Sequence, residues 1–350
     1  MTKLKQLLTA TTALAFAGGV ALAEPDLLWF EAQGDAMTEA GAFKKDGPWT
    51  VALVFPDLSN SWRVQAVEEA RSAAAADERF EDLIVTNYQE DVSVMISDVE
   101  DMLARGVDAI MIHTGQIGLL NEQVEKAKEL GIPVINFGQI DPDIDYASQM
   151  WAGGESYGRT GGEWLVEKLP DGGEVWALRG IAGHSEDVAR YNGMSAAIDG
   201  AGIEVTREDY GAWSYEGSKP LCESWVLSGD LPDAIWSGGA DMTRACLDVF
   251  AELGIEPILM TGEGNNGLMR QWSEMGLDSM AASFPPSMFA VGLNGVAELL
   301  DGGQLAKSYW AEPEAITNDN LAEYYHPEAN DNLWVPTTLT SEQISELFPR

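Results

Sequence analysis

Short apolar runs, rich in β-branched and aromatic residues, alternate with longer segments of helical composition along most of this 350-residue chain. The short runs predict strands at residues 50–55, 82–87, 109–113, 133–137, 174–178, 204–209, 234–236, 257–261 and 279–284. The longer segments predict helices at 62–76, 92–105, 119–130, 157–168, 189–201, 218–227 and 242–253. Such alternation favours right-handed βαβ units on parallel sheets. We therefore expect an α/β fold with two open, mostly parallel-sheet, Rossmann-like lobes.

The N-terminus has the layout of a secretory signal peptide. Lys3 and Lys5 precede an apolar run over residues 7–20, which leads into the small-residue site Ala21-Leu22-Ala23. A membrane anchor is the alternative, but threonines and glycines interrupt the run, and it falls short of the ~20 apolar residues that span a bilayer. We expect cleavage after Ala23, export to the periplasm and no direct membrane insertion.

Acidic residues dominate the charge of the chain. There are 57 Asp and Glu against 20 Lys and Arg, which gives a formal net charge of -37. A protein that binds nucleic acid neutralises phosphates with clustered Lys and Arg, and the sequence has no such cluster. The composition therefore excludes a nucleic-acid partner.

The chain has two cysteines, Cys222 and Cys246, both in segments predicted to be helical. In an oxidising compartment a disulfide between them would persist. The alternative is a pair of buried thiols that act as small apolar side chains. Neither cysteine lies in a CxxC pattern, so a redox role is not indicated.

The loops that follow the predicted strands are the candidate site, because ligands of open parallel sheets bind beyond the carboxyl ends of the strands. These loops combine amides, hydroxyls, acids, an arginine and tryptophans. Such a set suits a neutral polyhydroxylated ligand, since indoles pack on the apolar face of a sugar ring while polar side chains bond its hydroxyls. The candidate ligand-binding residues are Asn60, Trp62, Arg63, Thr114, Gln139, His184, Asp187, Trp213, Tyr215, Asp241, Glu263, Asn265 and Asn266.

Residues 262–267 fit the GxGxxG pattern of dinucleotide-binding turns. However, Glu263 would face the pyrophosphate, and no strand with a ribose-binding acid follows at the expected distance. We therefore expect no nucleotide cofactor.

Metal sites are not indicated either. Asp141, Asp143 and Asp145 have the opening spacing of a calcium loop, but Tyr146 replaces its required Gly. The histidines are too scattered along the chain to form a metal cluster by spacing; they are His113, His184 and His326.

The chain lacks the GxSxG and HExxH motifs of common hydrolases. Asp187, Asp241 and Glu263 follow strands and could converge, which leaves a glycosidase as an alternative. We expect a binding protein that is not an enzyme.

Several segments together resemble the type I periplasmic sugar-binding proteins, the ribose-binding-like family that delivers solutes to ABC importers. The similarity extends from Trp49 to about Lys307 and is carried by residues 51–63, 99–110, 131–135 and 190–193. The resemblance implies that Asn60 and Trp62 contact the sugar and that Arg190, from the R-x-x-G pattern, binds ring hydroxyls. It also implies that an aromatic residue after the next strand, Trp213 or Tyr215, stacks on the ligand.

Some positions depart from the ribose-type pattern. Gly138-Gln139 stands where that pattern has Asp-Arg, and Gly239-Ala240-Asp241 stands where it has Asn-Asp. These changes favour another pentose, a hexose or a sugar alcohol over ribose as the cargo.

The resemblance further implies two lobes joined by a three-crossover hinge. The crossovers fall at Gly153 and Gly154, at Pro285 and Pro286, and at Pro313. The first lobe then comprises residues 24–152 and 285–313 and the second 153–284 and 314–350, after a signal peptide at 1–23. On this division the C-terminal tail, from about Thr317, packs on the second lobe.

The partners implied by the resemblance are a small sugar or polyol and the membrane permease of an ABC importer. The alternative is a sugar-sensing receptor that docks on a histidine kinase or chemoreceptor through the same lobe surface. We expect a monomer.

Overall fold

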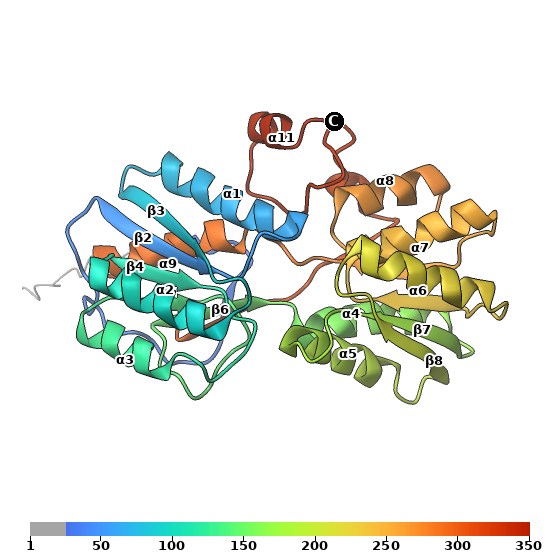
Figure 1. The fold of residues 1–350 in the computed structure, drawn as a ribbon, viewed down its shortest axis with the longest axis horizontal. Coiled ribbons are helices and arrows are strands. Elements are labelled where there is room, and N and C mark those ends of the chain that lie inside the picture. The colour runs from blue at the N-terminus through green and yellow to red at the C-terminus, as the bar shows by residue number, and fades with distance from the viewer. Residues whose placement is uncertain (1–25) are drawn as a thin grey trace, which may run out of the picture.

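The computed structural model describes residues 26–350 and folds them into two α/β lobes side by side (Figure 1). The predicted signal peptide and its cleavage site lie outside the described residues. Within the described part of the chain, no helix is long and apolar enough to cross a membrane.

The first lobe is built on a seven-stranded sheet. Its elements are β1 (Glu31–Ala32), β2 (Trp49–Phe55), α1 (Ser61–Ala76), β3 (Phe80–Asn87), α2 (Val92–Arg105), β4 (Ala109–Ile112), α3 (Asn121–Glu129), β5 (Val134–Asn136), β6 (Ser148–Ala152), α9 (Met288–Asp301) and β12 (Ser308–Ala311). The strand order is β1-β12-β6-β5-β4-β2-β3, and only the short β1 pairs antiparallel to its neighbour.

The second lobe is built on a six-stranded sheet in the order β13-β11-β10-β9-β7-β8. Its elements are α4 (Gly154–Lys168), β7 (Gly173–Arg179), α5 (Ser185–Ile198), β8 (Ile203–Tyr210), α6 (Tyr215–Leu227), β9 (Ala234–Ser237), α7 (Ala240–Leu253), β10 (Leu259–Glu263), α8 (Asn266–Met275), β11 (Ser279–Ala282) and β13 (Ala315–Thr317). The pairing of β13 with β11 is antiparallel and the other pairings are parallel.

The chain passes between the two sheets three times, after β6, after β11 and after β12. This confirms the predicted fold class of two parallel-dominated sheets with a three-crossover connection. At the first crossover Gly153 and Gly154 have φ of +98° and +58°, backbone conformations that glycine adopts without steric cost.

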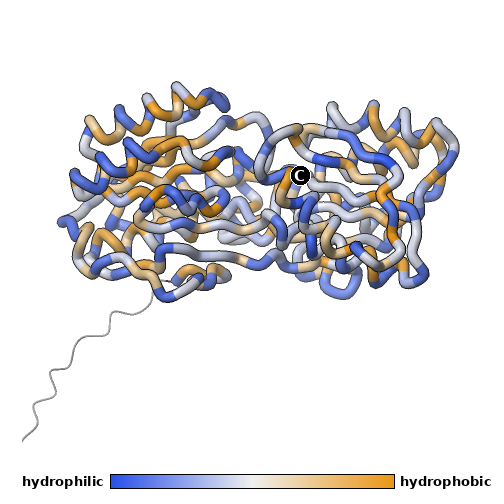
Figure 2. Tube along the Cα trace, turned by 90° about the horizontal axis from the view of Figure 1, so that it is seen from below, coloured by the Kyte–Doolittle hydropathy of each residue, from blue (hydrophilic) through white to orange (hydrophobic). Residues whose placement is uncertain are grey.

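The strands form the core of each lobe. All four residues of β4 are buried, as are six of the seven residues of β2, because helices cover both faces of a parallel sheet. Figure 2 shows apolar stretches running through the interior of both lobes, with hydrophilic stretches at their margins.

The strand β6 was not predicted, because its sequence SQMWA begins with two polar residues. Both polar atoms of the Gln149 side chain make hydrogen bonds within the first lobe. Its Oε1 accepts from the backbone N–H of Asp141 at 2.8 Å, and its Nε2 donates to the Asp141 carbonyl at 3.0 Å. A buried amide whose hydrogen bonds are made is tolerated inside a strand. Composition alone therefore does not reveal this strand.

The C-terminal tail was predicted to pack on the second lobe, but in the structure it contacts both lobes. After α10 (Leu321–Tyr324) it lies against α8, and it then crosses to α1 of the first lobe before ending in α11 (Ser341–Leu347). Figure 1 shows this red segment and α11 above the junction of the lobes, next to α1. Hydrogen bonds from both lobes hold the tail in this position.

The two cysteines are joined. Cys222 on α6 and Cys246 on α7 form a disulfide with their Cα atoms 5.3 Å apart. Of the two alternatives that the sequence left open, the structure has the bridge, which ties together neighbouring helices of the second lobe.

Candidate binding site

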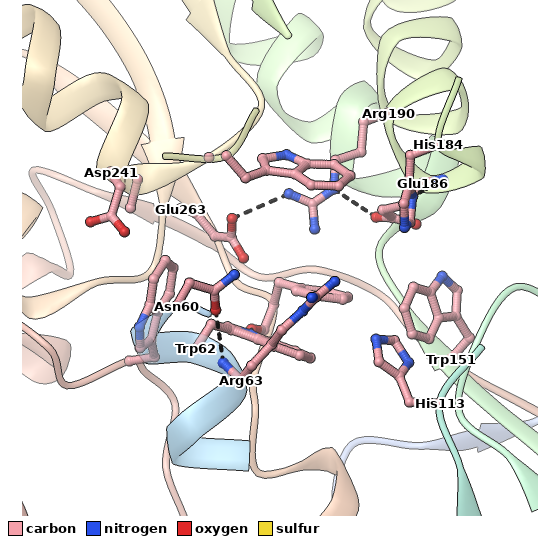
Figure 3. Close-up of a pocket in the computed structure, with 15 residues that line it drawn as sticks. Asn60, Trp62, Arg63, His113, Trp151, His184, Glu186, Arg190, Asp241 and Glu263 are labelled. Atoms are coloured by element: carbon pink, nitrogen blue, oxygen red, sulfur yellow. Dashed lines mark hydrogen bonds and ion pairs between the residues drawn. The ribbon is translucent and has the colours of Figure 1, made fainter. Parts of the chain in front are cut away.

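A pocket lies between the two lobes at the carboxyl ends of the strands. It contains roughly 640 Å³ of space not filled by protein atoms, a volume that includes the part open to solvent. Its walls are Asn60, Trp62, Arg63, His113, Trp151, His184, Glu186, Arg190, Trp213, Gly239, Ala240, Asp241, Glu263, Phe284 and Trp334. Figure 3 shows Asn60, Trp62 and Arg63 of the first lobe facing Arg190 and Glu263 of the second.

Trp62 connects α1 with the second crossover. Its ring stacks on Phe284 with centroids 4.9 Å apart and planes 11° from parallel. Its Nε1 donates to the Phe284 carbonyl at 2.7 Å. Trp62 is therefore both a pocket wall and a contact that fixes the chain segment between the lobes.

Trp213 forms another wall, from the loop after β8. Its φ of 48° and that of Ala212, 56°, lie in the left-handed region, which costs a residue other than glycine about 1–3 kcal/mol. A Cβ on Gly180 would lie 2.2 Å from Trp213 Cε2, so glycine there makes room for the indole. The Nε1 of Trp213 donates to the Gly238 carbonyl at 3.0 Å. Strained residues of this kind are concentrated at ligand-binding positions.

Arg190 of α5 is the electrostatic centre of the pocket and is 3% exposed. Its Nε donates to Glu186 Oε1 at 2.6 Å, and its Nη1 donates to Glu263 Oε2 at 3.2 Å and to the Gly238 carbonyl at 2.7 Å. One guanidinium cannot neutralise two carboxylates in a desolvated site. Burial therefore raises the pKa of Glu186 and raises that of Glu263 to about 7, even though Arg190 opposes both shifts.

Arg63 of α1 is also paired with two acids. It bonds Asp57, and its Nη2 lies 2.7 Å from Glu90 Oε1. Asn60 caps the same helix, since its Oδ1 accepts from the Arg63 backbone N–H at 2.9 Å. The helix cap thus holds Asn60 and Arg63 at the mouth of the pocket.

His113 lies at the end of β4 against Trp151, with the two rings stacked 5.7 Å apart. Burial lowers the pKa of His113 to about 3, so the ring is neutral at physiological pH. Its Nδ1 contacts the Phe137 carbonyl, which requires the proton on Nδ1 and leaves Nε2 as an acceptor.

Eight predicted residues line this pocket: Asn60, Trp62, Arg63, His184, Arg190, Trp213, Asp241 and Glu263. Of the two predicted stacking residues the pocket contains Trp213, whereas Tyr215 points elsewhere and donates its hydroxyl to Asp248 Oδ2 at 2.6 Å.

Five further predicted residues lie outside the pocket because other parts of the protein use their polar atoms. Thr114 bonds Asn136, and Gln139 donates across the cleft to the Ser185 carbonyl at 2.9 Å. Asp187 accepts from Arg179 and from the Gly180 N–H, both at 2.7 Å. Asn265 and Asn266 hold the C-terminal tail. These five residues and Tyr215 do not line the pocket in the structure.

The pocket also contains Trp151, Phe284, Glu186 and Trp334, which were not predicted as ligand-binding residues. Trp151 belongs to the unpredicted strand β6, directly before the Gly153 crossover. Trp334 comes from the tail, for which no function was predicted. A tryptophan far beyond the last predicted strand could have indicated a site residue.

The GxGxxG segment is closed to a nucleotide by the tail. The Gly264 carbonyl accepts from Val335 N at 2.9 Å, and Asn266 N donates to the Leu333 carbonyl at 2.8 Å. Glu263 is engaged by Arg190.

The Asp141 carboxylate accepts from the Gly118 N–H at 2.6 Å, and residues 26–350 contain no group of three or more His, Cys, Asp and Glu that could hold a metal ion.

Comparison with curated proteins finds sugar-binding relatives. The ribose import binding protein of Bacillus subtilis (strain 168) is 22% identical over 262 residues, 74% of this chain and 84% of that protein. The D-ribose/D-allose-binding protein of Pseudomonas aeruginosa is 30% identical over 214 residues, 58% of this chain and 66% of that protein.

Solved structures share the fold. The periplasmic binding component of the arabinose ABC transporter from Shewanella sp. ANA-3, bound to L-arabinofuranose, matches with a TM-score of 0.71 at 20% identity over 79% of this chain and 94% of that chain. A galactofuranose binding protein matches with a TM-score of 0.71 at 22% identity, over 79% and 97%. The family described as the periplasmic binding protein domain matches residues 51–304. With the two lobes, the three crossovers and the pocket between them, this match shows that the chain belongs to the periplasmic binding protein family.

Proposed function

We propose that this protein captures a neutral sugar or sugar alcohol between its lobes and delivers it to the membrane permease of an ABC importer. The observation that carries the proposal is the pocket, in which indoles of both lobes face Asn60, Arg63, Arg190 and Asp241. Flat indoles suit the apolar face of a sugar ring, and the polar groups suit its hydroxyls. The names of the relatives, which include ribose, allose and xylitol, support the same ligand class.

The charge of the pocket favours a neutral ligand over a sugar phosphate or a sugar acid. Arg63 and Arg190 are each already paired with two carboxylates, and Asp241 adds a further acid to the wall. An anionic ligand would meet these carboxylates without a free cation to receive it.

We propose binding without catalysis. Glycoside hydrolysis requires a pair of carboxyl groups on either side of the scissile bond. Asp187 is held outside the pocket by Arg179, and Glu263 is held by Arg190, so the three predicted acids do not assemble as a catalytic set. The relatives belong to a class of binding proteins, which supports this reading.

We further propose that the mature protein begins at Glu24, after cleavage behind Ala23, and acts as a periplasmic monomer. The family supports the compartment, and the N-terminal sequence supports the cleavage site. The intact mass of exported protein tests the site, because retention of Met1 would contradict it.

Thermal unfolding and calorimetry with pentoses, hexoses, cyclitols and polyols test the ligand class. A ligand at 100 times its dissociation constant adds about 2.7 kcal/mol of stability, which is easily detected. Binding of one neutral sugar, with no response to its phosphorylated or oxidised derivative, is the expected result. A response to the anionic derivatives alone would refute the proposal.

A further inference from the structure

The segment from His326 to Gln343, here called the strap, lies beyond the 51–304 match to the family and connects both lobes. Its first part is anchored on the second lobe. The Asn266 side chain donates to the carbonyls of His326 and Asn330 at 2.9 and 3.0 Å, and Arg244 and Arg270 both bond Asp331, at 2.9 and 2.8 Å.

The last part of the strap is anchored on α1 of the first lobe. Glu69, 1% exposed, accepts from the hydroxyl of Thr337 at 2.8 Å and from the backbone N–H and hydroxyl of Thr338 at 3.0 and 2.6 Å. Gln343 bonds Ser72 at the far end of the same helix. Since Glu69 is itself buried, these hydrogen bonds fix the last part of the strap on the first lobe.

Trp334 lies between the two anchors and is held by both lobes. Its backbone N–H donates to Gln65 Oε1 at 2.7 Å, and its carbonyl accepts from Gln65 Nε2 at 2.9 Å. On its other side its backbone forms a β-bridge with Asn265 in the loop before α8. Its indole Nε1 donates to Ser61 Oγ at 2.9 Å, which sets the plane of the ring.

The indole of Trp334 is a wall of the sugar pocket, next to Ser61 and on the same side as Asn60. We propose that Trp334 is a ligand-contacting, specificity-determining residue and that the strap exists to place it there. This inference rests on the proposed sugar-binding function and concerns the same pocket. An indole bonded to Ser61, on a backbone held by both lobes, presents a rigid surface, so it restricts which sugar shapes and substituents fit in the pocket.

The test is calorimetry of wild type, Trp334→Ala, Trp334→Phe and Thr338→Val with D-ribose, L-arabinose, D-galactose, xylitol and myo-inositol. Thr338→Val is the matched control, because it removes a strap hydrogen bond to Glu69 and leaves the indole in place. We expect Trp334→Ala to weaken binding of the preferred sugar by about tenfold and to change the order of preference among the five. Trp334→Phe should keep most of the affinity with a changed order, and Thr338→Val should keep the wild-type order.

A change in the order of preference among the five sugars is the result that a merely structural role of Trp334 would not produce. Wild-type affinities in Trp334→Ala, or an equal loss for all five sugars with a lower melting temperature, would overturn the proposal. If Trp334→Ala does not fold, an unchanged order of preference in Trp334→Phe overturns it as well. If the wild type itself binds none of the five, nor any other neutral sugar, the proposed function fails and this inference fails with it, an outcome distinct from a failure confined to the variants.

Discussion

The backbone N–H of Gly154 donates to Oε1 of Glu186 at 2.9 Å, and the same oxygen accepts from Arg190 at 2.6 Å. Gly154 belongs to the first crossover, whereas Glu186 and Arg190 belong to the pocket. The crossover backbone and the central ion pair of the site therefore share one carboxylate oxygen. All three residues belong to the second lobe, so the central ion pair is tied to the backbone at the point where the chain enters that lobe.

Gly153→Ala tests this coupling. The φ of Gly153 is +98°, and a Cβ there would lie 2.7 Å from Glu186 Oε1 and 2.9 Å from the Phe284 ring. The substitution should weaken sugar binding by roughly 1–2 kcal/mol without removing a ligand contact, because it strains the crossover and displaces Glu186. The control is Gly254→Ala, at a glycine that also has a positive φ, +62°, but nothing within 4 Å of its Cβ. Equal affinities of the two variants in calorimetry would argue against the coupling.

Arg190→Ala should lower affinity more than Trp62→Ala does. Removal of Arg190 takes away a charged donor whose hydrogen bonds to ligand hydroxyls contribute about 1.5–3 kcal/mol each, and it also leaves Glu186 and Glu263 without their cation. The loss of the Trp62 ring removes stacking of about 0.5–1.5 kcal/mol beyond its buried area. Calorimetry measures the affinities, and the exposed pair of Arg105 and Asp101 supplies the control variant Arg105→Ala. A smaller loss for Arg190→Ala than for Trp62→Ala would remove Arg190 from the centre of the site.

Glu263 should make folding stability depend on pH in a definite direction. Burial raises its folded pKa to about 7 from an ordinary value of 4.5. Between these values the folded state holds a proton that the unfolded state has released, so the unfolding free energy falls as pH rises. Its contribution is fully present below pH 4.5, is lost by about pH 7 and is constant above that.

The measurement is chemical denaturation of wild type and Glu263→Gln across pH 4.5 to 8. The difference between the two curves isolates Glu263 from the many other carboxylates of the chain. Wild type should lose stability relative to the variant up to about pH 7. Parallel curves would show that Glu263 does not titrate in this range.

The disulfide should matter for stability and not for ligand binding. Cys222 and Cys246 enclose a separation of 24 residues, and a bridge of that size typically contributes about 2–4 kcal/mol. Neither residue lines the pocket. Cys222→Ala with Cys246→Ala should therefore unfold at lower denaturant concentration and bind sugar with unchanged affinity. An oxidised mass equal to the reduced mass would show that the bridge does not form.

The fold could be predicted because the alternation of strands and helices is a local property of the sequence. Asn60 and Trp62 could be predicted as site residues from local sequence too, since they lie at the end of the loop after β2 and at the start of the next helix. Trp334 could not, because it reaches the pocket through contacts with Gln65, 269 positions away in sequence. Asp187 lies outside the pocket for a different reason: a strand-end acid looks the same in sequence whether it faces a ligand or, as here, Arg179.

The last prediction concerns closure of the lobes on the ligand. Apart from the strap and the crossovers, two hydrogen bonds link the described residues of the two lobes across the cleft: Gln139 Nε2 donates to the Ser185 carbonyl at 2.9 Å, and Ser185 Oγ donates to the Gly115 carbonyl at 2.8 Å. Gly115 and Gln139 belong to the first lobe and Ser185 to the second. None of the three lines the pocket, so these bonds favour the closed arrangement without contacting the ligand.

Gln139→Ala with Ser185→Ala should therefore shift the ligand-free protein toward open forms and weaken sugar binding. Each neutral hydrogen bond contributes about 0.5–1.5 kcal/mol, which predicts a loss of roughly tenfold in affinity. Ser345→Ala, which removes a hydrogen bond within the exposed helix α11, is the control and should bind like wild type. Small-angle scattering should show a radius of gyration that falls on addition of the sugar in both wild type and variant, from a larger starting value in the variant. A radius of gyration that does not change at saturating sugar in either protein would mean that ligand binding does not close the lobes.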